Sequence, residues 1–130
     1  MKKTPRQLKA KLDKVFSLYI RTKYADWRGN VACYTCGRIH PIKSIQCGHF
    51  IRRQHLATRW DENNARPQDY GCNVGQGGNY DVFALKLLKE IGQEGLEELQ
   101  RKKDTPKKWK LAELESLLEY YQQKLAETTQ

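Results

Sequence analysis

Apolar side chains recur every three to four positions over residues 5–27, which is the spacing of one face of an α-helix. Thr4 followed by Pro5 supplies an N-cap and a first-turn proline for this helix. The apolar stripe consists of Leu8, Leu12, Val15, Phe16, Tyr19 and Ile20. The pattern predicts an amphipathic N-terminal helix that ends in the polar turn at residues 26–30.

The same period returns in the C-terminal part of the chain. It predicts one helix ending at Gly92, a short helix over residues 94–101, and a last helix after the break at 102–106. The stripe of the last helix consists of Leu111, Leu114, Leu118, Tyr121 and Leu125. Such a stripe suits packing within the chain, and it equally suits a two-fold pair of helices from two copies.

Between these helices, residues 31–79 show no helical period. They are rich in Gly, Asn, Cys and Arg, and they offer only short candidate strands, at 31–34, 44–51 and 65–68. A segment of this kind builds little core by itself, so we expect a bound metal to stabilise it. The layout predicts an α+β protein in which a metal-stabilised core lies between helices.

The composition limits the classes of protein that this chain can represent. With 130 residues, 38% of them hydrophobic and 30% charged, it has the size of a single domain, 1–130, with one small core. Its expected parts are a basic N-terminal helix (1–30), the metal-containing core (31–79) and the C-terminal helices (80–130).

The sequence offers neither a membrane span nor a signal for secretion. No apolar run approaches the roughly 18–20 residues of a membrane-spanning helix. The first residues lead into the amphipathic helix without the apolar stretch of a signal peptide. We therefore expect a cytoplasmic protein with no membrane partner.

The net charge of +9 is concentrated in the first half of the chain. Residues 1–30 carry nine Lys and Arg against two acids, whereas residues 67–130 carry nine against eleven. A phosphate backbone is the natural partner of such a surface, and a basic surface without a partner is the alternative. The N-terminal helix is then either a DNA-binding face or a cover for the metal-bound core.

The four cysteines are too few and too clustered for a secreted disulfide framework. Cys33 and Cys36 form a Cys-x-x-Cys knuckle, which favours a metal over a disulfide in a reducing cytosol. Structural zinc takes four tetrahedral ligands, commonly from two such knuckles. Asp69-x-x-Cys72 is the expected second knuckle, and Cys47 is the alternative fourth ligand. We expect structural Zn²⁺, with ordinary buried thiols as the alternative.

A second group of polar residues consists of His49, Asn64 and Asn73. A histidine at a strand end can take a proton from water near neutral pH, and an asparagine can hold a backbone segment or coordinate a hard ion. Asn73 directly follows Cys72, so a zinc knuckle would fix its position. Taken singly these residues are commonly structural, but in this order after a Cys-x-x-Cys they form a pattern with functional meaning.

Together these segments resemble the NinG (Rap) family of phage recombination nucleases and, more broadly, the HNH or His-Me finger superfamily. The resemblance covers roughly residues 15–125, and the chain looks like a version without the long basic, Cys-containing N-terminal extension of some relatives. The motifs are Cys33-Tyr-Thr-Cys36-Gly, Cys47-Gly-His49-Phe, Thr58-Arg-Trp-Asp-Glu-Asn-Asn64, Pro67-Gln-Asp-Tyr-Gly-Cys72-Asn73 and Gly78-Asn79.

The resemblance implies a small zinc-containing ββα-metal (HNH) core that hydrolyses DNA phosphodiesters with a catalytic Mg²⁺ or Mn²⁺. The substrates would be branched recombination intermediates such as Holliday junctions and D-loops. His49 would match the general base, Asn64 the residue that bridges the loop and orients the histidine, and Asn73 the ligand of the catalytic ion. Two positions depart from the pattern: Asp69 replaces a cysteine, and Gly48 stands where some members have a metal-binding Asp.

Four arginines near these motifs are the expected DNA contacts: Arg52, Arg53, Arg59 and Arg66. We expect Trp27 and Trp60 in the core. Cleavage of a junction cuts two symmetric strands, so a homodimer is mechanically attractive. Two alternatives stay open: a non-catalytic, zinc-dependent DNA-binding recombination accessory protein, and a sequence-specific HNH nuclease.

Overall fold

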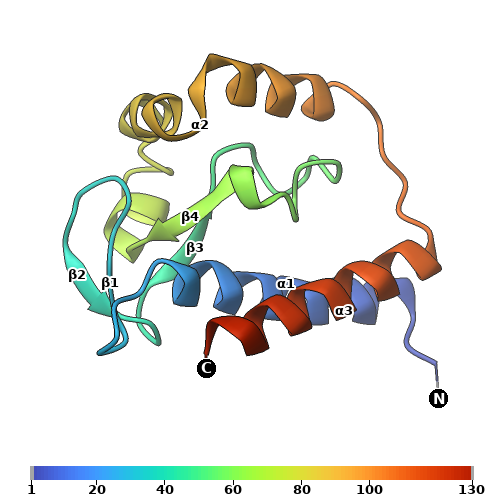
Figure 1. Cartoon of the computed structure of the whole chain (residues 1–130). Coiled ribbons are helices and arrows are strands. Elements are labelled where there is room, and N and C mark those ends of the chain that lie inside the picture. Colours follow the sequence, from blue (N-terminus) through green and yellow to red (C-terminus); the bar gives the residue numbers. More distant parts are fainter. Residues whose placement is uncertain (1, 130) are drawn as a thin grey trace.

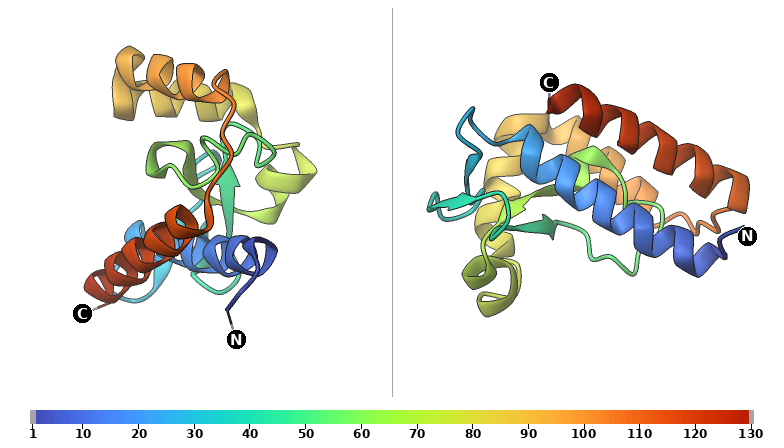
Figure 2. Two further views of the ribbon diagram at one scale, coloured as in Figure 1. Left: turned by 90° about the vertical axis from the view of Figure 1, so that its right-hand side faces the viewer. Right: turned by 90° about the horizontal axis from the view of Figure 1, so that it is seen from below.

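The computed structural model describes residues 2–129 and confirms a mixed α+β architecture (Figure 1). A β-hairpin lies in the middle of the molecule, with one kinked helix on one side of it and two long helices on the other (Figures 1 and 2). In chain order the elements are α1 (Pro5–Lys23), β1 (Asn30–Ala32), β2 (Ile39–Pro41), β3 (Gln46–His49), η1 (Glu62–Asn64), β4 (Ala65–Gln68), η2 (Gly71–Gly75), α2 (Tyr80–Lys103) and α3 (Leu111–Thr128). Within residues 2–129, no helix combines the length and the apolar character that crossing a membrane requires.

Helix α1 begins where the sequence predicts and ends four residues earlier. The Thr4 hydroxyl accepts from the Gln7 backbone N–H at 3.2 Å, and the Gln7 side chain accepts from the Thr4 N–H at 2.9 Å. This capping box starts the helix at Pro5. The Asp26 carboxylate then accepts from two backbone N–H groups of the following turn, which ends the helix at Lys23.

The expected core position of Trp27 is wrong, because the residue lies in this turn beyond the end of α1. Its side chain is 87% exposed, and the Arg28 guanidinium lies 4.8 Å from the centre of its ring. Trp60, the other tryptophan expected in the core, is buried between α1 and α3.

Helices α1 and α3 lie side by side and share the largest core (Figures 1 and 2). Phe16 of α1 packs edge-on against Tyr121 of α3, whose hydroxyl donates to the carbonyl of Trp60. The apolar stripe of the last helix packs within the chain, which was one of its two expected uses, since Leu114, Leu118 and Tyr121 are buried.

Two small antiparallel sheets form the middle of the chain. Strand β1 pairs with β2, and β3 pairs with β4 in a register that places His49 opposite Ala65. All four residues of β4 are buried: α1 packs against the hairpin on one side, and α2 lies on the other side (Figure 1). The strand predicted at 65–68 is confirmed, the strands at 31–34 and 44–51 are shorter than expected, and β2 was not predicted.

The break predicted at Gly92 is confirmed as a kink inside α2. Gly92 adopts φ 75° and ψ 173°, which lies outside the helical region and divides α2 into two helical segments. Phe83 and Leu87 from the first segment and Leu99 from the second pack with Ile51 in a separate core beside the hairpin.

Candidate functional site

Four side chains from two turns converge in a cluster that suits a zinc ion. Cys33 and Cys36 lie in the turn after β1, Asp69 follows β4, and Cys72 lies in η2. Their ligand atoms all lie within 4.8 Å of one another. In a tetrahedral zinc site with Zn–S bonds of about 2.3 Å, ligand atoms lie roughly 3.7 Å apart, so this donor set needs only a small contraction to hold the metal.

The second knuckle is built by backbone hydrogen bonds as well as by side chains. The Asp69 carboxylate accepts from the Cys72 N–H at 2.8 Å, and the Asp69 N–H donates to the Cys33 sulfur at 3.3 Å. His40 Nε2 lies 3.2 Å from the second carboxylate oxygen of Asp69 and can orient it. The structure therefore brings together the Cys33, Cys36, Asp69 and Cys72 set that the sequence predicts.

The alternative fourth ligand, Cys47, lies outside this cluster. It lies on β3 and packs against the core of α1 and α3, where burial raises the pKa of its thiol to about 12. Alternation along the strand explains the difference, because Cys47 and His49 share the face of β3 that is turned to α1. The structure thus selects Asp69 over Cys47.

His49 ends β3 with its ring fixed in one tautomer. Its Nε2 lies 2.9 Å from the carbonyl oxygen of Arg59. A carbonyl can only accept, so Nε2 carries the hydrogen and Nδ1 presents its lone pair. Burial lowers the pKa of the ring to about 4, which keeps it neutral and able to accept a proton at physiological pH.

Asn64 is fully buried and holds the loop that runs from β3 to η1. Its Oδ1 accepts from the Ile51 N–H at 2.7 Å, and its Nδ2 donates to the carbonyls of Ile51 and Thr58 at 3.0 and 3.1 Å. Thr58 directly precedes Arg59, whose carbonyl binds the His49 ring. The contacts of Asn64 are therefore those of a side chain that bridges the loop beside the histidine.

Asn73 lies in η2, directly after Cys72 of the four-residue cluster. Its Nδ2 donates to Gln46 Oε1 at 2.8 Å, and its backbone N–H donates to the Asp69 carbonyl at 2.8 Å. An amide held through its nitrogen presents its oxygen as the atom able to coordinate a hard ion.

His49 and Asn73 line one pocket of about 420 Å³. Its other lining residues are Cys47, Arg52, Arg53, Val74, Gly77 and Tyr80, and none of the lining residues carries a carboxylate. Two guanidinium groups and no acid make the pocket electropositive, which favours an anion such as a phosphate.

The three loop arginines differ in how free they are to meet a partner. Arg52 lies 5.9 Å from the ring of Tyr80, at the rim of the pocket. Arg53 is 56% exposed and pairs with Asp13 at 2.7 Å. Arg59 is more enclosed and binds the same carboxylate through two nitrogens.

The expected DNA contact at Arg66 is wrong. This residue of β4 is 1% exposed, and its Nη1 donates to the carbonyls of Glu62 and Ala65. Its Nε forms an ion pair with Glu90 at 3.1 Å, and its guanidinium lies 5.4 Å from the ring centres of two tyrosines, Tyr24 and Tyr34. Arg66 joins the hairpin to α2 and cannot reach a nucleic acid.

Two residues near the site were not found by sequence reasoning. The first is Asp13, which accepts hydrogen bonds from Arg53, Arg59 and the indole of Trp60. The sequence feature that could have indicated Asp13 is its position as an isolated acid in a strongly basic helix. Burial opposes ionisation of Asp13, but the two guanidinium groups outweigh it and lower its pKa. Gln68 is buried and joins the turn of Cys33 and Cys36 to the segment after η2, because its Nε2 donates to Thr35 Oγ1 and to the Gly78 carbonyl. No local signal in the sequence marks this residue.

Comparisons with known proteins assign the chain to a family. The family model described as "Bacteriophage Lambda NinG protein" matches residues 1–130. "Protein ninG" of Escherichia phage 933W is 29% identical over 97 residues, which cover 74% of this chain and 47% of that protein. "Protein ninG" of Escherichia phage lambda is 28% identical over 97 residues, with the same coverage. This chain thus spans about half the length of the curated relatives it matches, and no solved structure matches it. The match over all its residues shows that the chain belongs to the NinG family.

Proposed function

We propose that this chain is a metal-dependent endonuclease of the HNH, or His-Me finger, type that hydrolyses DNA phosphodiesters. One observation carries the proposal: a neutral His49, with Nδ1 free of hydrogen, lines an electropositive pocket together with Asn73. This combination can activate water beside a phosphate, which a purely structural histidine in an apolar core could not do.

In the proposed reaction, His49 takes a proton from a water that attacks the scissile phosphorus, and the bond to the 3′-oxygen breaks. The Arg59 carbonyl keeps the ring oriented, and Asn64 keeps the loop that carries this carbonyl in place. Arg52 and Arg53 bind the phosphoryl oxygens by charge-assisted hydrogen bonds.

Asn73 would hold the divalent ion through its Oδ1, and Mg²⁺ or Mn²⁺ suits this oxygen donor. The ion, when bound, supplies positive charge that stabilises the phosphoryl oxygens and the leaving group. Since Asn73 is the one side chain of the pocket that offers an amide or carboxylate oxygen, waters and the substrate phosphate would complete the coordination. The separate Cys33, Cys36, Asp69 and Cys72 cluster would hold a structural Zn²⁺ that fixes Asn73 through Cys72.

We propose branched DNA, such as Holliday junctions and D-loops, as the substrate. This part rests on the likeness to the NinG family together with the basic first half of the chain. Because a junction is cut in two symmetric strands, two copies would act on one junction.

A second function is favoured by one specific feature, the lack of any carboxylate among the residues that line the pocket. With so few ligands for a divalent ion, the chain would act as a zinc-dependent DNA-binding accessory protein without catalysis. The nuclease would cleave DNA only when Mg²⁺ or Mn²⁺ is present. The accessory protein would cleave no DNA, and it would bind DNA equally well with and without these ions.

The deciding experiment compares cleavage of a four-way junction, a flap and a linear duplex, with and without Mg²⁺ or Mn²⁺. We expect His49→Ala to lower the cleavage rate by about 10²–10⁴ while DNA binding is retained. His55→Ala is the matched control, because His55 lies in the same loop but does not line the His49 pocket.

The outcomes separate the proposals clearly. Cleavage by His49→Ala at the wild-type rate would contradict the assignment of the base. Binding of DNA without cleavage of any substrate, in Mg²⁺ or in Mn²⁺, would favour the accessory protein. Cleavage of the linear duplex at one sequence, at the same rate as cleavage of the junction, would indicate a sequence-specific nuclease.

A further inference from the structure

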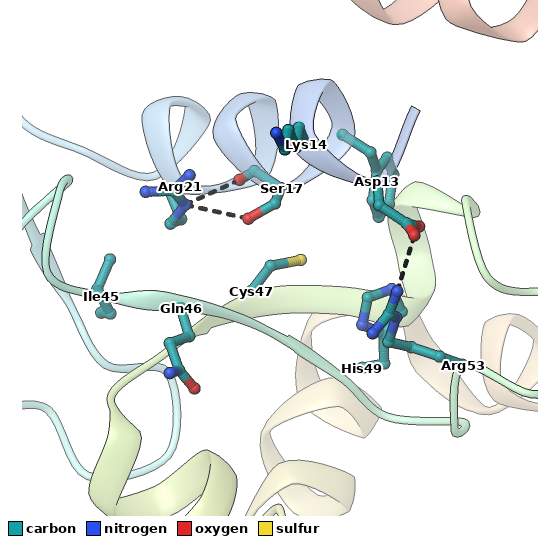
Figure 3. Close-up of a pocket in the computed structure, with 10 residues that line it drawn as sticks. Asp13, Lys14, Ser17, Arg21, Ile45, Gln46, Cys47, His49 and Arg53 are labelled. Carbon is teal, nitrogen blue, oxygen red and sulfur yellow. Dashed lines mark hydrogen bonds and ion pairs between the residues drawn. The ribbon is translucent and has the colours of Figure 1, made fainter. Parts of the chain in front are cut away.

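A second cavity of about 420 Å³ opens beside His49, between α1 and β3 (Figure 3). Asp13, Lys14, Ser17 and Arg21 of α1 form one wall, and Gln46, Cys47 and His49 of β3, with Ile45 before them, form the other. Phe16 and Arg53 complete the lining. We call this cavity the α1 groove.

The α1 groove carries a net positive charge. Lys14, Arg21 and Arg53 line it, whereas Asp13 is its one acid. Both oxygens of Asp13 are already engaged by Arg53, Arg59 and Trp60, so this carboxylate adds little negative potential for a ligand to meet.

Two of the three cations are placed to accept a new partner. Lys14 is exposed and takes part in none of the ion pairs found among residues 2–129. Arg53 shares Asp13 with Arg59, so it can turn to a phosphate without leaving the carboxylate unpaired. Arg21 differs, since it donates to Ser17 and to the Ile42 carbonyl and thereby fixes the wall of the groove.

The groove is continuous with the pocket that holds Asn73. Cys47, His49 and Arg53 line both cavities, so His49 lies at their junction. A chain of phosphates that places one phosphate at His49 and Asn73 would therefore place a neighbouring one within the α1 groove.

We propose that the α1 groove binds one DNA strand on one side of the phosphate to be cleaved. Lys14 is the phosphate contact of the groove itself, and Arg53, which lines both cavities, lies between this phosphate and the one to be cleaved. This proposal rests on the nuclease function proposed above and gives α1 a direct part in holding the substrate. The groove has a volume of about 420 Å³, which is too small to take in a paired DNA helix, so a single strand is the occupant.

The test measures binding of a labelled single-stranded oligonucleotide by the 130-residue His49→Ala protein at several salt concentrations. In this background, Lys14→Ala should weaken binding on the order of 5-fold and lower the salt slope by about 0.7, the loss of one phosphate contact. Lys23→Ala is the matched control, because Lys23 is an exposed lysine on the same helix that does not line the groove. Lys23 follows Lys14 by nine residues, or about two and a half helical turns, so it lies on the opposite face of α1.

Equal binding by the Lys14→Ala and Lys23→Ala proteins would overturn the groove proposal, and so would an unchanged salt slope for Lys14→Ala. Neither result would affect the nuclease proposal, which is tested by cleavage with intact His49. Conversely, the Lys14→Ala protein could bind the oligonucleotide more weakly than the Lys23→Ala protein while the wild-type protein cleaves no DNA. This result would support DNA binding in the α1 groove and contradict the nuclease function.

Discussion

Among single residues, His49 shows how local surroundings decide the chemistry open to a side chain. An exposed histidine is partly protonated near its ordinary pKa of about 6.5. At the end of β3 the ring is partly buried, and its one fixed hydrogen bond goes to the Arg59 carbonyl. The result is a neutral ring with a defined acceptor nitrogen.

This burial predicts a pH dependence of stability. Burial lowers the pKa of His49 to about 4, so between pH 6.5 and 4 the unfolded chain binds more protons than the folded one. The contribution of His49 to the free energy of unfolding is complete above pH 6.5 and is lost as the pH falls towards 4. Urea denaturation at pH 7 and pH 5 should show a larger fall in midpoint for wild type than for His49→Gln. The same fall in both proteins would contradict the lowered pKa.

The sequence located most of the site residues but could not tell which polar residues face inward. The spacing of the motifs favoured Cys33, Cys36, Asp69 and Cys72, because two knuckles carry their own local geometry, but only the structure places Cys47 outside this cluster. Trp27 was misplaced because α1 ends four residues before it, and the turn formed by Asp26 leaves the indole exposed. Arg66 was misplaced because its burial depends on Glu90, a partner distant in the chain. Asp13 was missed for the same reason.

Among the elements, the hairpin of β3 and β4 depends on a close approach at Gly48. A Cβ atom on residue 48 would lie 1.9 Å from Gln68 Oε1, and Gln68 is buried with its Nε2 bonded to Thr35 and Gly78. A side chain at position 48 must therefore displace that of Gln68.

We expect Gly48→Ala to lower the free energy of unfolding by about 2–4 kcal/mol, because it overpacks the hairpin and breaks the bonds of Gln68. Chemical denaturation measures the loss. Gly75→Ala is the control, since the atom nearest to its Cβ would be 4.0 Å away. In a Gln68→Ala background the obstruction is gone, so the same substitution at position 48 should cost less. An equal cost in both backgrounds would exclude the close approach as the cause.

Helices were predicted better than strands. The capping box at Thr4 and the glycine at position 92 act within a few residues, so their effects are visible in the sequence. Strand β2, Ile39–Pro41, has only three residues, too few for an alternation to be recognised in the sequence, and it pairs with β1. The stripe of the last helix was correctly located, but its partner, α1, could not be identified without the fold.

For the whole molecule, the candidate metal cluster of Cys33, Cys36, Asp69 and Cys72 joins distant parts of the chain. Its ligands come from the turn after β1 and from the end of the hairpin, and between them lie His49 and Asn64. The core around it contains few apolar side chains, among them Val31 and Ile45. Metal binding would therefore supply much of the folding free energy of this region.

Metal analysis of purified variants tests this arrangement. We expect about one zinc per chain in the wild-type protein and in Cys47→Ala, and a clear loss of zinc in Cys36→Ser. Removal of zinc by a chelator should lower the melting temperature, and cleavage should return only when both Zn²⁺ and Mg²⁺ are supplied. Loss of zinc from Cys47→Ala, or full retention in Cys36→Ser, would contradict the ligand set.

The order of the zinc ligands along the chain also bears on synthesis. Cys33 and Cys36 leave the ribosome early, whereas Asp69 and Cys72 follow only after the loop and both hairpin strands have been made. A nascent chain interrupted before Cys72 can neither close the metal cluster nor supply Asn73. Under the nuclease function proposed above, an unfinished translation product would carry His49 without Asn73 or the closed cluster, and it would therefore not cleave DNA.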